Sequence, residues 1–278
     1  MTVARRSGPF LVRALRSCDR EIDKALPRVL RAKDDEAVHA LRVGIRRMRV
    51  LLKLARPVFG RFYADAVRAQ YTIVHQSTGA LRDAEVLEDT VTALGLSGPS
   101  FALWLTRRRA VEAQLRRGVV RDLVAGQLSG ASALLRALLL LPIAPANDVA
   151  LVRFAAKSVA RAQARVTKLA GAPPHDVVAL HALRIAYKGL RYATEILAAA
   201  LSPELVTLGA PAAKFQKRLG EIHDLDVARV VTARARSLTP AARTHALALL
   251  LAARNAAVAK YLAEPPLPIV RRARPPVA

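Results

Sequence analysis

Two stretches of the chain carry histidine, arginine and lysine at helical spacing. VHALRVGIRRMRVLLKL occupies residues 38–54 and contains no acidic residue, and LHALRIAYKGLRYATEIL begins at residue 180. Side chains three or four positions apart share one face of a helix, so each set of cations forms a stripe. The first stripe comprises His39, Arg42, Arg46, Arg49 and Lys53. The second stripe comprises His181, Arg184, Lys188 and Arg191.

Each stripe has the chemistry of an anion-binding surface. Like charges at this spacing repel one another, so a ligand that neutralises them would stabilise the helix. The planar guanidinium of arginine is a fork that can donate two parallel hydrogen bonds to one phosphate. Lys188, which aligns with Arg46, has the same charge but lacks this forked geometry. The alternative is an ordinary solvent-exposed, arginine-rich face. Two stripes at matched positions favour a phosphate-rich ligand over that alternative.

The histidines that head the stripes are candidate ligand contacts. A neutral histidine can donate one hydrogen bond to phosphate, and a nearby phosphate would raise the pKa of the imidazole. The alternative is a buried histidine that orients its helix. We expect no catalytic histidine and no metal site, because no HExxH or HxxxH spacing is present. The remaining histidines do not recur at matched positions and are interpreted as incidental: His75, His175, His223 and His245.

The similarity of the two halves extends beyond the stripes. TGALRDAEVLEDTV from residue 78 resembles LGEIHDLDVARVVT from residue 219. The alignment pairs Gly79 with Gly220, Asp83 with Asp224 and Glu85 with Asp226. We interpret the chain as a tandem duplication whose seam lies near LLLLPIAPAND, where two prolines interrupt any helix.

The paired carboxylates of these segments favour a structural role. Asp83 and Glu85 are two positions apart, as are Asp224 and Asp226, so each pair lies on different faces of a helix. Capping of a helix or an ion pair with a neighbouring arginine fits that arrangement. The alternative, a metal or general-base site, lacks a third or fourth carboxylate nearby.

The hydrophobic pattern predicts an all-α protein. In the first copy Val38, Leu41, Ile45, Met48 and Leu52 form an apolar face beside the first stripe. The pattern and the helix breakers predict helices over 8–32, 35–55, 60–76, 80–94, 99–118, 119–140, 148–170, 176–200, 203–218, 221–237 and 239–262. We expect one domain, 1–264, made of two repeats (about 8–140 and 148–262), followed by a basic, proline-rich tail over 265–278.

The charge balance predicts a polyanionic partner. Among 278 residues, 45 are lysine or arginine and 21 are acidic, for a net charge of +24, and such an imbalance makes a compact domain repel itself. Nucleic acid, inorganic polyphosphate and an anionic membrane surface would each compensate for it. Aromatic residues are only 4% of the chain, which disfavours recognition of bases by stacking.

The sequence also predicts a cytoplasmic protein with no membrane span and no cofactor. Cys18 is the only cysteine, so one chain can form neither a disulfide nor a cysteine zinc site. The first 20 residues lack the apolar core of a signal peptide, and the apolar run ALLLLPIA is too short to cross a bilayer. The oligomeric state is not predicted.

Together, the two histidine-headed motifs and the glycine–aspartate segments resemble the CHAD domain (conserved histidine α-helical domain). The resemblance covers almost the whole chain in the duplicated order of that family. It implies two four-helix-type halves related by a pseudo-twofold axis around a basic central groove, which binds inorganic polyphosphate. The family positions fall on His39, Arg42, Arg46, Arg49, His181, Arg184, Lys188 and Arg191. Gly189 aligns with Arg47, where a further basic residue is common, so the second stripe is expected to be thinner.

The sequence therefore favours a non-enzymatic polyphosphate-binding protein, stand-alone and associated with polyphosphate granules. Further basic residues would widen the groove if the halves face each other: Arg13, Arg153, Lys214 and Lys217. The alternative is a protein that binds nucleic acid without regard to its sequence. A polyphosphatase or phosphotransferase is disfavoured, because a P-loop, a carboxylate cluster and an evident nucleophile are all missing from the sequence.

Overall fold

The chain is all-α, as the hydrophobic pattern predicts. The computed structural model describes residues 6–31 and 35–268, and within those ranges it contains helices and no β-strand. None of the helices in these ranges is long and apolar enough to cross a membrane. The prediction for the tail falls largely on residues 269–278, which lie outside the described residues; just before them, Gln163 Nε2 donates a hydrogen bond of 2.9 Å to the carbonyl oxygen of Pro268.

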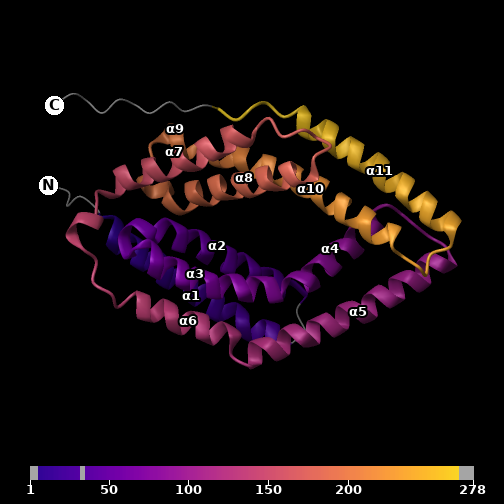
Figure 1. The fold of residues 1–278 in the computed structure, drawn as a ribbon, viewed down its shortest axis with the longest axis horizontal. Helices are drawn as coiled ribbons and strands as arrows, with labels where there is room; N and C mark the ends of the chain where they lie inside the picture. The colour runs from indigo at the N-terminus through magenta and orange to yellow at the C-terminus, as the bar shows by residue number, and fades with distance from the viewer. Residues whose placement is uncertain (1–5, 32–34, 269–278) are drawn as a thin grey trace. The chain divides into compact units, whose positions relative to one another are not determined.

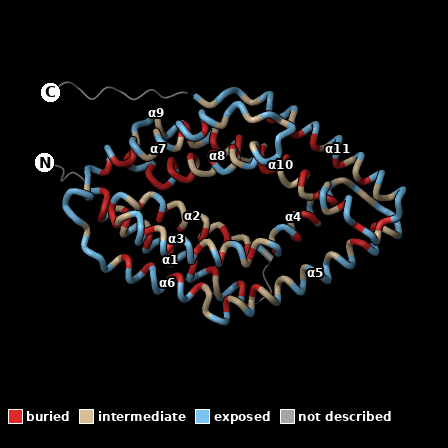
Figure 2. Tube along the Cα trace, in the orientation of Figure 1, coloured by how far each residue is buried: buried red, intermediate tan, exposed pale blue. Residues whose placement is uncertain are grey.

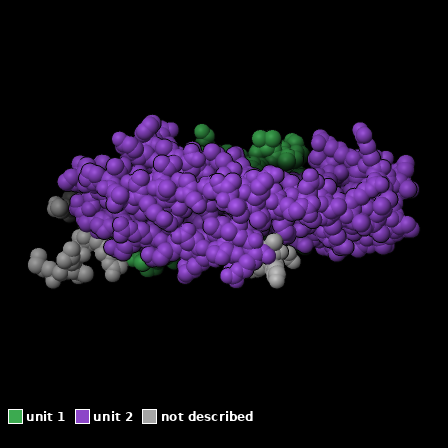
Figure 3. All heavy atoms as spheres, turned by 90° about the horizontal axis from the view of Figure 1, so that it is seen from below, with its two compact units in different colours: residues 1–5, 150–226, 252–278 green, residues 6–149, 227–251 purple. Residues whose placement is uncertain are grey.

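The chain divides into two compact units, coloured separately in Figure 3. Unit 1 comprises residues 1–5, 150–226 and 252–278, and unit 2 comprises residues 6–149 and 227–251. Two helices, α10 (Gly209–Ala233) and α11 (Pro240–Leu262), therefore contain residues of both units. The organisation as one domain of two repeats stays a prediction.

In the described residues of unit 2, six helices lie wholly within the unit, in addition to its parts of α10 and α11 (Figure 1). They are α1 (Ser7–Leu30), α2 (Asp35–Phe59), α3 (Arg61–Ser77), α4 (Gly79–Ala93), α5 (Pro99–Val124) and α6 (Gln127–Leu138), followed by the short 3-10 helix η1 (Pro145–Asn147). Helix α2 packs between α1 and α3, α3 also packs on α6, and α4 packs on α5.

The apolar face of α2 forms the centre of this packing. Val38, Leu41, Ile45, Met48 and Leu52 are each at most 1% exposed, and buried positions recur along α1, α2 and α3 at helical intervals (Figure 2). Burying each large side chain contributes roughly 1.5–3 kcal/mol. The apolar face of α2 packs against neighbouring helices. The first stripe lies on the adjacent face of α2, so this packing fixes its position at the edge of the core.

Unit 1 is built around a pair of packed helices, α7 (Leu151–Leu169) and α8 (Val177–Leu197). Asp176 caps α8 by accepting a hydrogen bond of 2.9 Å from the backbone N–H of Ala179. Tyr187 of α8 stacks on Phe215 of α10 with ring centroids 4.8 Å apart. The remaining elements are η2 (Ala198–Ala200) and α9 (Pro203–Val206).

Two predicted helix boundaries are wrong. The expected break between 118 and 119 is absent, because α5 continues to Val124 and the chain turns at Gly126, which has φ 90°. The expected helices 203–218 and 221–237 are instead α9 and the continuous α10, which passes through Gly220. A Cβ on Gly220 would lie at an ordinary contact distance of 3.6 Å from Arg184 Nε, so this glycine is an internal residue of α10 that is not required by a close approach.

Candidate anion-binding site

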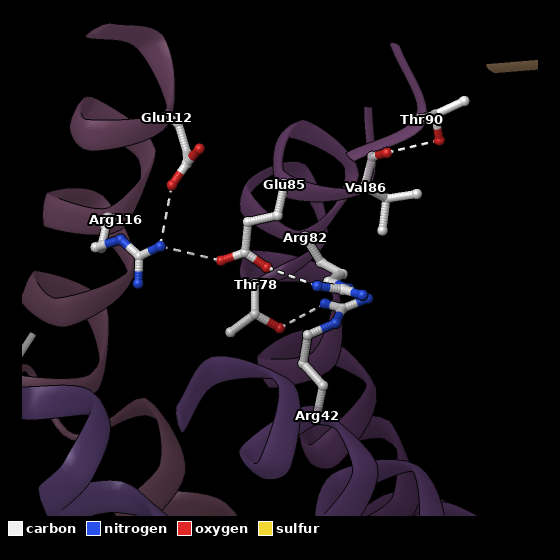
Figure 4. A network of polar contacts seen from close by, with 8 residues as sticks. All are labelled: Arg42, Thr78, Arg82, Glu85, Val86, Thr90, Glu112 and Arg116. Carbon is white, nitrogen blue, oxygen red and sulfur yellow. Dashed lines mark hydrogen bonds and ion pairs between the residues drawn. The ribbon is translucent and has the colours of Figure 1, made fainter. Parts of the chain in front are cut away.

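In unit 2 the first stripe runs along α2 and differs in burial from end to end. Arg42 is 7% exposed, His39, Arg46 and Arg49 are half-buried, and Lys53 is exposed. Arg42 Nη1 donates a hydrogen bond of 2.6 Å to Thr78 Oγ1 (Figure 4). It also donates one of 2.9 Å to the His75 carbonyl oxygen. Part of the Arg42 guanidinium is therefore committed to joining α2 to the α3–α4 junction.

The arginines of unit 2 form a cluster whose positive charges act on one another. Burial, with a smaller contribution from the neighbouring Arg46, lowers the pKa of Arg42 to about 10. Burial also lowers the pKa of Arg49, with contributions from Arg68 of α3 and from Arg46. The cluster, called the unit 2 cluster, comprises Arg42, Arg46, Arg49 and Arg68. No acidic residue contributes to the shift of Arg49, so an anion from outside would be strongly stabilised there.

Three donors of this cluster are buried without a partner. The Nε atoms of Arg42, Arg49 and Arg68 have no hydrogen-bond acceptor within the described part of the chain. A buried N–H that makes no hydrogen bond costs about 1–3 kcal/mol, and more when the group is charged. The cluster therefore combines mutually repelling charges with unsatisfied donors, and an oxyanion bound to its guanidinium groups would reduce that repulsion.

At its N-terminal end the first stripe meets a chain of ion pairs. Burial lowers the pKa of His39, Arg82 of α4 lowers it further, and Glu36 opposes the shift. Arg82 Nη1 donates a hydrogen bond of 3.1 Å to Glu85. Arg116 Nη2 of α5 donates hydrogen bonds of 3.2 Å to Glu85 and 3.0 Å to Glu112 (Figure 4). Glu85 is thus a structural ion-pair residue, the reading that its spacing from Asp83 favoured.

A cleft of about 880 Å³ lies beside these ion pairs. Its lining includes the acids Glu36, Glu85, Glu88, Asp89 and Glu112 as well as the arginines Arg82, Arg109, Arg116, Arg117 and Arg121. Such a mixed lining repels a polyanion in part, so this cleft is a poorer phosphate site than the unit 2 cluster. No group of three or more histidine, cysteine or carboxylate side chains able to hold a metal occurs in the described ranges.

In unit 1 the second stripe runs along α8 and is joined by a histidine from α10. His181 is exposed, and Arg184, Lys188 and Arg191 are half-buried. The imidazole of His223 lies beside that of His181, with ring centroids 5.0 Å apart and planes at 47°. Burial lowers the pKa of His223 to about 4, and the positive charges of Arg184 and Lys188 add to the effect, as does His181.

Acidic and polar partners occupy part of the second stripe. Arg191 Nε donates 2.6 Å to Glu195, and Arg191 Nη1 donates 3.4 Å to Gln216. Asp226, which aligns with Glu85, also pairs with an arginine: Arg254 Nε of α11 donates 2.5 Å to it, and both residues are buried. Arg254 Nη2 further donates 2.9 Å to the Pro174 carbonyl oxygen.

The four additional basic residues lie on three helices. Arg13 on α1, Arg153 on α7 and Lys217 on α10 are exposed. Lys214 on α10 forms an ion pair of 2.6 Å with Glu264, so the charge of Lys214 is already partly neutralised. Glu264 also accepts a hydrogen bond of 2.9 Å from Arg218 Nε. That these residues border a common groove stays a prediction.

Sequence reasoning missed three basic side chains that meet the stripes: Arg68, Arg82 and His223. Nothing in the pattern of α3 singled out Arg68. Arg82 and His223 did carry a signal, because each stands three residues after the matched glycines Gly79 and Gly220. The matched position holds an arginine in one half and a histidine in the other. Because no histidine recurs there, His223 was interpreted as incidental.

Comparison with known proteins agrees with the fold and the motifs. The CHAD domain family model matches residues 13–233, and the chain belongs to this family. The crystal structure of the CHAD domain from the plant Ricinus communis is similar with a TM-score of 0.74 and 22% identity, over 98% of this chain and 96% of that one. PptA from Streptomyces chartreusis has a TM-score of 0.71 and 20% identity, over 93% and 98%. No curated protein matches the chain.

Proposed function

We propose that this protein binds inorganic polyphosphate through the first and second stripes. The observation that carries the proposal is the unit 2 cluster, where the charges of half-buried and buried arginines act on one another and three Nε donors make no hydrogen bond within the described residues. Family membership supports the same ligand. Each phosphate of the polymer offers the oxygens that an arginine fork fits, and its negative charge offsets the repulsion within the cluster.

A polymer of phosphates suits this surface better than a nucleic acid. Binding would release counterions from the polymer, so the affinity should fall steeply as salt is added, for either ligand. A nucleic acid, however, gains much of its single-stranded affinity from stacking on aromatic side chains, and these are scarce in the chain. Nucleic acid is therefore the second candidate ligand.

We further propose that binding involves no catalysis and no cofactor, and that it takes place in the cytoplasm, on polyphosphate granules. The carboxylates near the stripes are engaged by arginines: Glu85 by Arg82 and Arg116, and Asp226 by Arg254. A carboxylate held in this way is a weak general base. Release of phosphate from polyphosphate in the presence of Mg²⁺ or Mn²⁺ would contradict this part of the proposal.

The test is a titration with long-chain polyphosphate at several salt concentrations. The double variant Arg46→Ala/Arg49→Ala should bind at least about tenfold more weakly, with a salt dependence reduced by roughly one unit of slope per lost contact. The matched control, Arg107→Ala/Arg234→Ala, removes the same charge from exposed positions of unit 2 and should change little. Equal losses in the two double variants would refute a specific site.

A competition experiment separates the two ligands. Excess double-stranded or single-stranded DNA should displace labelled polyphosphate only poorly at physiological salt. Efficient displacement at equal phosphate concentration would favour the nucleic-acid alternative.

A further inference from the structure

The stripes of the two units differ at one matched position. In unit 2 the residue three places after Gly79 is Arg82, which carries a permanent charge and pairs with Glu85 at 3.1 Å. In unit 1 the residue three places after Gly220 is His223, whose ring lies 5.0 Å from that of His181. The chain therefore places two titratable rings in unit 1 where unit 2 has a histidine and an arginine.

Several charged groups face the His181–His223 pair. From α8 these are Arg184 and Lys188, which act on both rings. From α10 itself, Asp226 acts on His223 in the opposite sense, but Asp226 is buried and held by Arg254 of α11. Cations thus dominate the surroundings, and a second positive charge on the pair is disfavoured while no anion is present.

We propose that the His181–His223 pair is a proton-linked phosphate site, which takes up a proton from solvent when polyphosphate binds to unit 1. This inference rests on the proposed function, because the linked anion is the polymer that the second stripe binds. A neutral imidazole has one N–H donor and one acceptor nitrogen. Protonation turns the acceptor into a second donor, so each protonated ring can hold a phosphate oxygen and add charge.

A bound phosphate supplies the negative charge that would stabilise a protonated imidazole at this pair. A negative oxygen beside the pair offsets the repulsion from Arg184 and Lys188, so the bound state favours the imidazolium. Without ligand, burial keeps the pKa of His223 low. A bound phosphate would raise this pKa and so oppose the effect of burial. By linkage, a site that gains a proton on binding must bind more tightly as the pH falls. The four arginines of the unit 2 cluster stay charged across this pH range, so in the first stripe only His39 could add such a dependence.

The experiment compares affinity for long-chain polyphosphate at pH 8 and pH 5.5, at constant ionic strength, in the native chain and three variants. His223→Gln keeps a polar side chain that cannot be protonated. His223→Arg restores at this position the residue type of unit 2. His175→Gln removes an exposed histidine of the same unit that precedes α8 and serves as the control.

We expect the native chain and the control to bind about tenfold more tightly at pH 5.5 than at pH 8. His223→Gln should lose most of the gain in affinity between pH 8 and pH 5.5, whatever its affinity at pH 8. His223→Arg should bind at least as tightly as the native chain at pH 8, with an equally flattened response. Calorimetry in two buffers of different ionisation enthalpy should show proton uptake on binding that both His223 variants reduce. The His223 imidazole resonance should titrate at higher pH with polyphosphate than without it.

Each outcome bears on one of the two proposals. Binding whose pH response is the same in the native chain and in both His223 variants would overturn the proton-linked site and leave polyphosphate binding intact. No binding by the native chain at either pH would overturn the proposed function and this inference with it. Thermal unfolding of each variant at both pH values identifies any loss of binding that is due to misfolding, and the NMR titration of the native chain decides the matter without a variant.

Discussion

The unit 2 cluster and the second stripe show two ways of building a cationic surface on a buried helix. In unit 2, Arg42 is locked to Thr78 while the Nε atoms of Arg49 and Arg68 remain unpartnered. In unit 1, Arg191 is partly neutralised by Glu195, and a histidine replaces an arginine of the other unit. Unit 2 thus holds a group of arginine charges together, whereas unit 1 has an acidic partner for one arginine and a histidine of lowered pKa in place of another. The comparison teaches that matched sequence positions need not carry matched electrostatics.

The largest expected effect concerns the matched ion pairs that support the two surfaces. Asp226→Ala should lower the free energy of unfolding by about 3–5 kcal/mol, because it leaves Arg254 buried without its carboxylate. Glu85→Ala, the matched change in unit 2, should cost only about 1–2 kcal/mol, since Arg116 keeps Glu112 and Arg82 is partly solvated. Urea unfolding checks both, and equal losses would mean that burial does not distinguish the pairs.

The next effect compares the stripes directly. Arg46→Ala/Arg49→Ala should weaken polyphosphate binding by at least about tenfold, and Lys188→Ala/Arg191→Ala by only about threefold, because Arg191 already donates to Glu195. Titration at one fixed salt concentration measures the difference. A greater loss from the unit 1 double variant would reverse the ranking of the two surfaces.

Acid should reduce the stability of unit 1 before any ligand is added. The pKa of His223 is about 4 in the folded protein against an ordinary value of 6.5, so between these values the unfolded chain binds more protons. The free energy of unfolding should therefore fall as the pH drops through this window, by at most about 1.4 kcal/mol per pH unit. His223→Gln should flatten the fall in urea unfolding at pH 7, 6 and 5. An identical pH profile for the two proteins would show that His223 is not the group responsible.

The smallest effect tests the arginine fork. Lys188→Arg gives the second stripe the residue that the first has at Arg46, and we expect binding to tighten by about two- to threefold. Arg46→Lys should weaken it by a similar factor. If both changes left the affinity unaltered, charge alone and not fork geometry would govern the surface.

Periodicity along single helices predicted much of this molecule. The spacing of Leu41, Ile45 and Met48 placed a core face on α2, and these residues are buried. The same spacing, displaced by one residue, placed the first stripe on the adjacent face. These features are local, because one helix fixes the relative directions of its own side chains.

Contacts between helices were not predictable in the same way. That Arg42 is buried against Thr78 depends on how α2 meets the α3–α4 junction, and that Arg68 acts on Arg49 depends on the packing of α2 and α3. The predicted boundary between 218 and 221 placed Gly220 just before a helix start. Instead α10 continues through this glycine, because the low helix propensity of one residue does not end a long helix.

The passage of α10 and α11 through both units has a consequence for dissecting the protein. A fragment that stops at residue 149 would retain the entire first stripe and yet lack 227–251, which unit 2 includes. Cutting at the seam between the two sequence halves therefore cannot yield two self-sufficient pieces. We expect separately produced pieces to regain native helix content only when mixed, as complementing fragments do.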